Sequence, residues 1–123
     1  MRYTLLLHSR EPAPGEIDPE ALSAMQEAFG AFGQALESAG VLVAAEVLQS
    51  REASTTVTLR EGSLQVQDGP FAETKEGLAG VFVLDVRDLD AALAWAEKCP
   101  GASYGVVEVR PVATSYIDGA WTT

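Results

Sequence analysis

Two helix-forming stretches, each lying between strand-forming stretches, constrain the fold of this 123-residue chain more than any other feature. The first, near residues 19–39, follows Asp18, whose carboxylate suits a helix N-cap, and stops at Gly40. The second opens at Asp88 and stops at the Cys-Pro-Gly sequence of residues 99–101. We expect the apolar side chains that recur at helical spacing to face inward: Leu22, Met25, Phe29, Phe32 and Leu36 in the first helix, and Leu89, Ala92, Leu93 and Ala96 in the second.

The strand-forming stretches complete a duplicated pattern. The predicted main strands are residues 2–8, 41–48, 80–86 and 106–112, and residues 55–67 form a hairpin with glycine in its turn. The order strand, helix, strand, hairpin, strand, helix, strand is typical of the α+β class. It predicts a ferredoxin-like plait, a βαβ-hairpin-βαβ arrangement whose antiparallel sheet carries two helices on one face. We expect one domain over residues 1–112, with the hairpin inserted at 55–67, and a C-terminal tail over residues 113–123.

The second face of the predicted sheet is as apolar as the first. Residues 41–45, 81–84 and 106–109 place valine and leucine on both faces, although an antiparallel sheet with one wet face alternates more cleanly. An apolar face of this size marks an interaction surface. We predict that a second copy covers it and forms a homodimer, a dimeric α+β barrel with two-fold symmetry. The alternative is that the hairpin or the tail of the same chain folds over this face.

Composition narrows the classes of partner. The chain has 18 acidic and 8 basic residues, a net charge of −10, and its basic residues are scattered singly. We therefore expect no direct binding of nucleic acid, which requires a concentrated basic surface. We expect no membrane span either, because no window approaches the ~20 consecutive apolar residues that cross a bilayer. The single Cys99 cannot form an intrachain disulfide and is expected to be a structural thiol, so we predict a cytoplasmic protein.

Residues 68–77, Asp-Gly-Pro-Phe-Ala-Glu-Thr-Lys-Glu-Gly, differ from ordinary scaffold. The Asp-Gly-Pro start predicts a tight turn, and Phe71 is expected to anchor the loop in the core. One interpretation places this loop at the rim of a pocket, with Asp68 as an acid-base group, Lys75 holding an anionic group and Glu73 orienting it. The other interpretation is a turn with an aromatic anchor and a solvated ion pair. The residues alone leave both interpretations open.

The same segment resembles the signature of the DGPF-domain branch of the YCII-related proteins. The resemblance continues in Tyr-Thr-Leu-Leu-Leu (residues 3–7), Ala-Gly-Val-Leu (39–42), Asp-Ala-Ala-Leu-Ala-Trp-Ala (90–96) and Val-Glu-Val-Arg-Pro-Val (107–112). It implies a dimeric α+β barrel of ferredoxin-like plaits. It also implies an enzymatic His and Asp pair in a pocket, for which Asp68 matches the aspartate, while the first helix contains no histidine. Genes of this branch often lie beside those of extracytoplasmic-function sigma factors, which implies a regulatory role.

His8, the only histidine, ends the first predicted strand. Histidine exchanges protons near neutral pH, so His8 is the second candidate catalytic residue, although a polar residue at a strand end is the simpler explanation. One histidine and one cysteine do not supply the ligands of a usual zinc site, and the chain has no phosphate-binding or dinucleotide-binding glycine motif. We therefore expect no metal and no cofactor.

Two functions compete on these observations. In the first, the protein binds or transforms a small polar molecule in a pocket near Asp68, with Phe71, Glu73 and Lys75 at the ligand. In the second, it is a non-catalytic regulatory module whose acidic surface docks on a basic partner such as an extracytoplasmic-function sigma factor. The sequence leaves open whether the protein is an enzyme.

Overall fold

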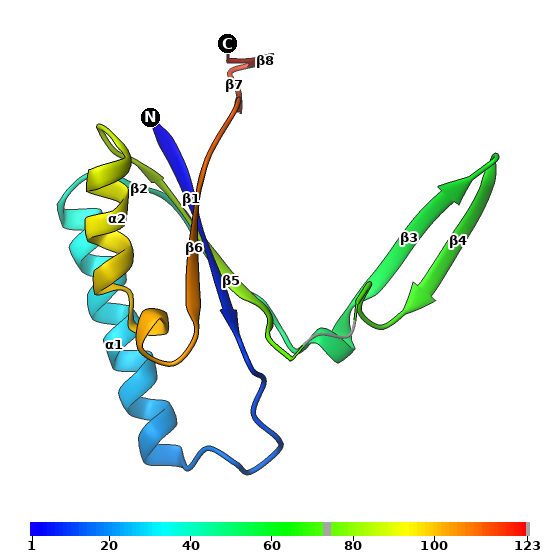
Figure 1. Ribbon diagram of the computed structural model, residues 1–123, viewed down its shortest axis with the longest axis horizontal. Coiled ribbons are helices and arrows are strands. Elements are labelled where there is room, and N and C mark those ends of the chain that lie inside the picture. The colour runs from blue at the N-terminus through cyan, green and yellow to red at the C-terminus, as the bar shows by residue number, and fades with distance from the viewer. Residues whose placement is uncertain (73–74, 123) are drawn as a thin grey trace.

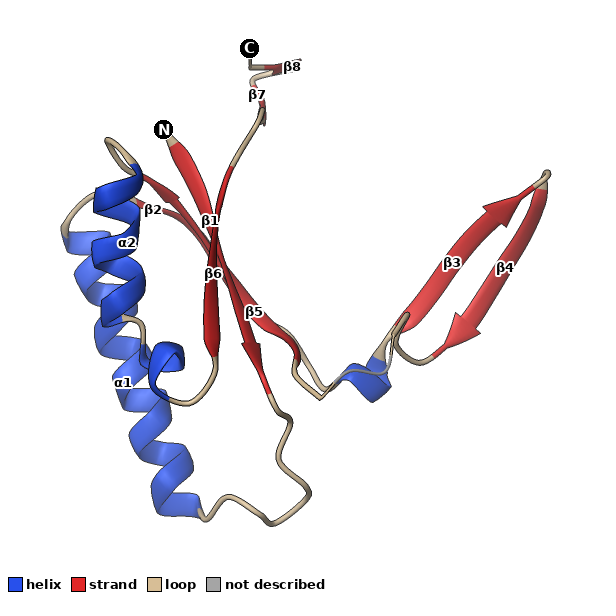
Figure 2. Ribbon diagram, viewed as in Figure 1, coloured by secondary structure: helices blue, strands red, loops and turns tan. Residues whose placement is uncertain are grey.

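The computed structural model describes residues 1–72 and 75–122. Its strands are β1 (Arg2–Ser9), β2 (Leu42–Val47), β3 (Thr55–Arg60), β4 (Ser63–Asp68), β5 (Gly77–Asp85), β6 (Val106–Pro111), β7 (Tyr116–Ile117) and β8 (Ala120–Trp121). Its α-helices are α1 (Pro19–Ser38) and α2 (Leu89–Lys98), and two short 3₁₀ helices are η1 (Arg51–Ala53) and η2 (Pro100–Ser103). The predicted α+β class and the predicted order of elements are confirmed (Figure 2).

The main sheet has four antiparallel strands in the order β2-β5-β1-β6. The two central strands, β1 and β5, belong to different βαβ units, as a ferredoxin-like plait requires. Leu5 lies opposite Phe82 on one side and Val109 on the other, so these three side chains share one face of the sheet. Both α-helices cover this face (Figure 1).

The core lies between the helices and this face. Along β1 the odd residues Tyr3, Leu5 and Leu7 are buried, while the even residues between them are only half-buried. Aromatic contacts tie the layers together, because the Phe32 ring of α1 meets both Phe82 at 5.2 Å and Trp95 at 6.4 Å between centroids. The side chains with no exposed surface at all include Leu36 and Leu84.

Both helices begin at the predicted caps. The carboxylate of Asp18 accepts a hydrogen bond from the Ala21 N–H at 2.7 Å, and that of Asp88 accepts one from the Ala91 N–H at 2.9 Å. The predicted inward faces are partly wrong, because Leu22, Leu89 and Leu93 are 45–46% exposed. In α2 the buried stripe is made of small residues, Ala92 and Ala96, with Trp95 beside them, and the two leucines lie at its edge. Leu22 lies on the first turns of α1, which the core does not cover.

A second, two-stranded sheet projects away from the plait, and we call this β3–β4 hairpin the arm (Figure 1). Its turn has positive φ at both central residues, Glu61 and Gly62, the conformation that suits a two-residue hairpin. The C-terminal strands β7 and β8 repeat this geometry at Asp118 and Gly119. This C-terminal hairpin was not predicted, although its Asp-Gly pair is a hairpin signal.

The arm is held at its base. The Glu11 carboxylate accepts hydrogen bonds from the Ser50 hydroxyl at 3.0 Å and from the Arg51 N–H at 2.7 Å. At the other strand of the arm, the Gly69 N–H donates to the Ser54 carbonyl at 2.7 Å, with Gly69 at a φ of +100° that favours glycine. These hydrogen bonds fix the position at which the arm leaves the plait.

Neither α-helix in the described part of the chain has the combination of length and apolarity that crossing a bilayer requires.

Candidate functional site

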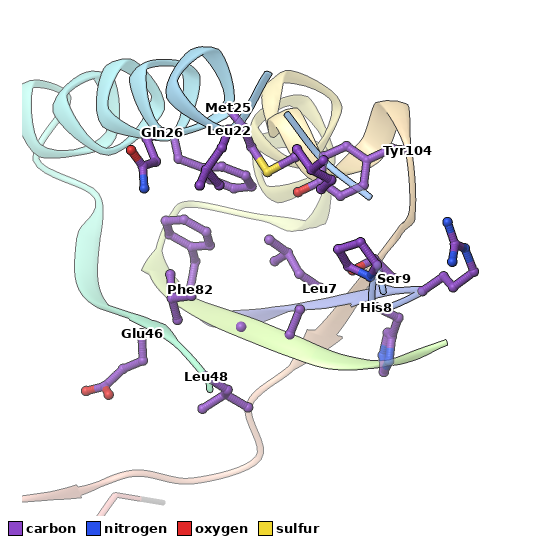
Figure 3. A pocket seen from close by; sticks show the side chains of 18 of the residues that line it. Leu7, His8, Ser9, Leu22, Met25, Gln26, Glu46, Leu48, Phe82 and Tyr104 are labelled. Carbon is purple, nitrogen blue, oxygen red and sulfur yellow. The ribbon is translucent and has the colours of Figure 1, made fainter. Parts of the chain in front are cut away.

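A cavity of about 900 Å³ lies between the first half of α1 and the end of the main sheet at which β1 stops. Helix α1 has 20 residues, and only its second half carries buried side chains, Phe32 and Leu36. Its first half therefore overhangs the core and leaves apolar side chains facing open space. Its apolar lining includes Leu7, Ile17, Leu22, Met25, Phe29 and Phe82. In Figure 3, Leu22 and Met25 lie above Leu7 and Phe82 across this space.

A few polar groups border the cavity. Arg10 and Glu16 form an ion pair at 2.6 Å that closes the loop between β1 and α1. This hydrogen bond from Arg10 is the main cause that lowers the pKa of the Glu16 carboxyl. Tyr104, which follows η2, borders the cavity from the side of the second βαβ unit. Partial burial raises the pKa of the Tyr104 phenol, so near neutral pH it is a neutral group that can donate a hydrogen bond.

His8 borders the cavity at the end of β1, and its ring takes part in a row of polar groups on the face of the sheet that carries no helix. We call this the open face; on it lie the even residues of β1 and their cross-strand neighbours Val81 and Val83. The His8 Nε2 atom lies 3.0 Å from the Glu108 carboxylate, which also accepts hydrogen bonds from the Arg110 guanidinium. A carboxylate that fixes an imidazole is an arrangement used in acid-base catalysis.

The Glu108 contacts predict an acid-dependent contribution to stability. Hydrogen bonding from Arg110, and secondly from His8, lowers the pKa of the Glu108 carboxyl below its ordinary value near 4.5. A lowered pKa means that the unfolded chain takes up this proton first. The contribution is therefore complete above pH 4.5 and is lost as the pH falls through the native pKa. We expect Glu108→Gln to lose less stability than the wild type between pH 7 and pH 3, measured by urea unfolding; parallel pH profiles would contradict this.

The structure separates the residues that the sequence analysis grouped. Among the described residues that line the cavity, His8 is the one that was predicted as catalytic. Asp68 is the last residue of β4, is exposed, and makes no side-chain hydrogen bond to any described residue. Lys75 is also exposed, and Glu73 lies outside the described residues. The prediction that Phe71 anchors its loop in the core is wrong, because its side chain is 95% exposed.

Two members of the site were not selected from the sequence. Glu108 sits within the apolar strand β6, and only the pairing of Leu6 with Glu108 and of His8 with Val106 brings its carboxylate beside His8. Tyr104 had no distinguishing neighbour in the sequence, and its place at the cavity depends on the turn made by η2. A carboxylate between two valines was the signal for Glu108, but its contact with His8 depends on the strand register, which no local pattern encodes.

The fold and the site define a class: a ferredoxin-like α+β domain with a mainly apolar cavity beneath an overhanging helix and a histidine–carboxylate pair on the open face of its sheet. The chain belongs to the YCII-related domain family, whose model matches residues 1–115. It is similar to an uncharacterised protein of Rhizobium meliloti, with 34% identity over 115 residues that cover 92% of this chain and 93% of that protein.

Proposed function

We propose that this YCII-family protein binds a small molecule with an apolar body and one polar end in the cavity beneath α1. The observation that carries the proposal is the overhang of α1, which holds Leu22 and Met25 above the sheet across the cavity, while Phe29 stacks on Phe82 at its inner end. The volume of about 900 Å³ lies within the range of small-molecule sites, roughly 300–1,000 Å³. The apolar lining favours a less polar ligand than the sequence predicted.

The polar groups give this ligand an orientation. Tyr104 supplies a hydrogen-bond donor at one side of the cavity, and His8 borders it where β1 ends. The His8 ring turns away from the cavity toward Glu108 on the open face, so we propose this pair as an acid-base group of that face, separate from the ligand site beneath α1. We also infer membership of the DGPF branch from residues 68–76, whose Asp-Gly-Pro turn ends the arm and returns the chain to β5.

Filling the cavity tests this proposal. We expect Met25→Trp to weaken binding of the apolar dye 1-anilinonaphthalene-8-sulfonate by about tenfold, because a larger side chain occupies the space beneath α1. Ala28→Trp is the matched control, since Ala28 is exposed on the same helix and does not line the cavity. Fluorescence titration gives the affinity. Dye binding should also move the NMR signals of the Tyr104 ring, which borders the cavity. Equal dye affinity of Met25→Trp and wild type would contradict the proposal.

We also propose that the protein is a homodimer whose subunits meet at the open face. Leu6, Val81 and Val83 lie there without a helix over them, and each keeps part of its side chain accessible. The alternative cover, the arm of the same chain, extends away from the main sheet (Figure 1). A second copy supplies apolar surface of the matching kind, as two-fold interfaces do.

The regulatory function stays a prediction. A sigma-factor partner is supported by the family resemblance of residues 68–76 and by the net charge of −10, which favours a basic partner in general. The cavity gives more specific support to ligand binding, and we therefore place that function first.

A further inference from the structure

The arm has two chemically different faces. In its register Val57 lies opposite Val66 and Leu59 opposite Leu64, so these four side chains share one face. The other face is polar throughout and carries Thr56, Thr58, Arg60, Ser63, Gln65 and Gln67. Strict alternation of this kind is the pattern of a hairpin that packs one face against other protein.

The described residues of the chain leave the apolar face of the arm uncovered. Its four apolar side chains are 58–66% exposed. The arm forms its own two-stranded sheet and pairs with no strand of the main sheet. A two-stranded hairpin alone is marginally stable in water, because it buries too little apolar surface to offset the ordering of its backbone. The arm therefore requires a surface that another molecule provides.

The solvent-accessible surface of this chain is larger than that of a compact chain of the same mass, and the excess indicates how much surface a partner can bury. A compact chain of 13.0 kDa exposes about 6,300 Å² by the usual scaling of surface with mass. This chain exposes 8798 Å². The excess of roughly 2,500 Å² is about three times the ~800 Å² that each partner buries in a standard interface. A stable association of two copies is therefore well within what this surface supports.

A second copy is the partner whose surface the structure displays. Each chain carries an apolar arm and, on the main sheet, the open face with Leu6, Val81 and Val83. The two open faces pair with one another, and two-fold symmetry lets each arm pack on the other subunit beside that contact, so the exchange is reciprocal. The hydrogen bonds from Ser50 and Arg51 to Glu11 hold the base of the arm in place. The arm can therefore extend from its own plait in a fixed direction.

We propose that the arm is an intersubunit clasp, which lays its apolar face on a second copy of the chain. Asp68 and Thr55 pair at the base of this same face, so the clasp places the Asp68 carboxylate at the subunit boundary. Asp68 does not line the cavity beneath α1, so a site that includes Asp68 would lie between the two chains. This inference rests on the proposed homodimer and adds a second contact surface and a residue contributed by the partner.

Polar substitution of one cross-strand pair tests the clasp. We expect Leu59→Asn with Leu64→Asn to raise the dissociation constant of the dimer by roughly 100-fold, because two apolar side chains are lost from the interface. The matched control is Thr58→Asn with Gln65→Asn, the adjacent pair on the polar face, which should stay within about twofold of wild type. Analytical ultracentrifugation measures both. Equal effects of the two double variants, or a monomeric wild type at micromolar concentration, would overturn the clasp.

Hydrogen exchange of the unmodified protein provides a test that does not depend on a variant folding. Amides of residues 57–66 should be protected at high protein concentration and lose protection on dilution, while amides of α1 and β5 keep theirs. Protection of the arm that does not change with concentration would show that no second copy covers it. The dye titration separates the proposals, because the cavity lies within one chain. If the Leu59→Asn, Leu64→Asn protein is monomeric and still binds the dye, both proposals are supported. If the wild-type protein is a dimer with a protected arm but does not bind the dye, the result contradicts the ligand-binding proposal and leaves the clasp proposal standing.

Discussion

Leu84→Ala should lower the free energy of unfolding by about 3–4 kcal/mol, which is a large part of the stability of a small domain. Leu84 has no exposed surface and lies in the central strand β5, opposite Tyr3 of β1 and Leu42 of β2. Truncation therefore removes packing against both neighbouring strands and leaves a cavity that the surrounding sheet cannot fill. Urea unfolding monitored by tryptophan fluorescence measures the loss.

Leu93→Ala is the matched control for this prediction. The same side chain is removed, but Leu93 is 46% exposed on α2, so the expected loss is below about 1 kcal/mol. If the two variants lose similar stability, the core does not lie between the helices and the sheet in the way described.

Val83→Glu should convert the proposed dimer to monomers, with a dissociation constant at least about 1,000-fold higher. Val83 lies at the centre of the open face, opposite Thr4 of β1 and Ala44 of β2, with Arg2 diagonal to it in the pairing register. Association would bury a carboxylate from each chain that has no cation directly opposite it. Sedimentation equilibrium should give twice the 13.0 kDa chain mass for the wild type and the chain mass for the variant.

The control for Val83→Glu adds the same charge on the opposite side of the plait. Leu93→Glu places a carboxylate on the exposed edge of α2, away from the open face, and should leave the association unchanged. A Val83→Glu protein that keeps the wild-type mass would show that the subunits do not meet at the open face.

Local signals made the elements predictable. Asp18 and Asp88 cap their helices by short-range hydrogen bonds that depend only on nearby residues, and Gly62 sits in the turn of the predicted hairpin. The order of these elements then selected the plait. Periodicity could not fix the rotation of α2, because leucine and alanine are both apolar and the tight approach to the sheet favours the smaller residue.

The site depended on distances that no local pattern encodes. The cavity exists because α1 is longer than the part of the sheet it covers, and the His8–Glu108 contact joins residues 100 positions apart. Phe71 was predicted to be buried from its apolarity alone, yet it lies beside the base of an arm that projects from the core. The same projection places Asp68 away from the cavity of its own chain.

The burial of Cys99 makes this protein convenient for spectroscopy. Its thiol is the only one in the sequence and is 2% exposed, and burial raises its pKa, so the reactive thiolate is scarce near neutral pH. A maleimide dye or nitroxide added to the folded protein should therefore leave the native thiol unmodified. A cysteine introduced at Gln65, on the polar face of the arm, is then the one thiol that reacts with the label. Distances between the nitroxides of two labelled chains, measured by electron paramagnetic resonance, can show how the chains are arranged while Cys99 stays in place.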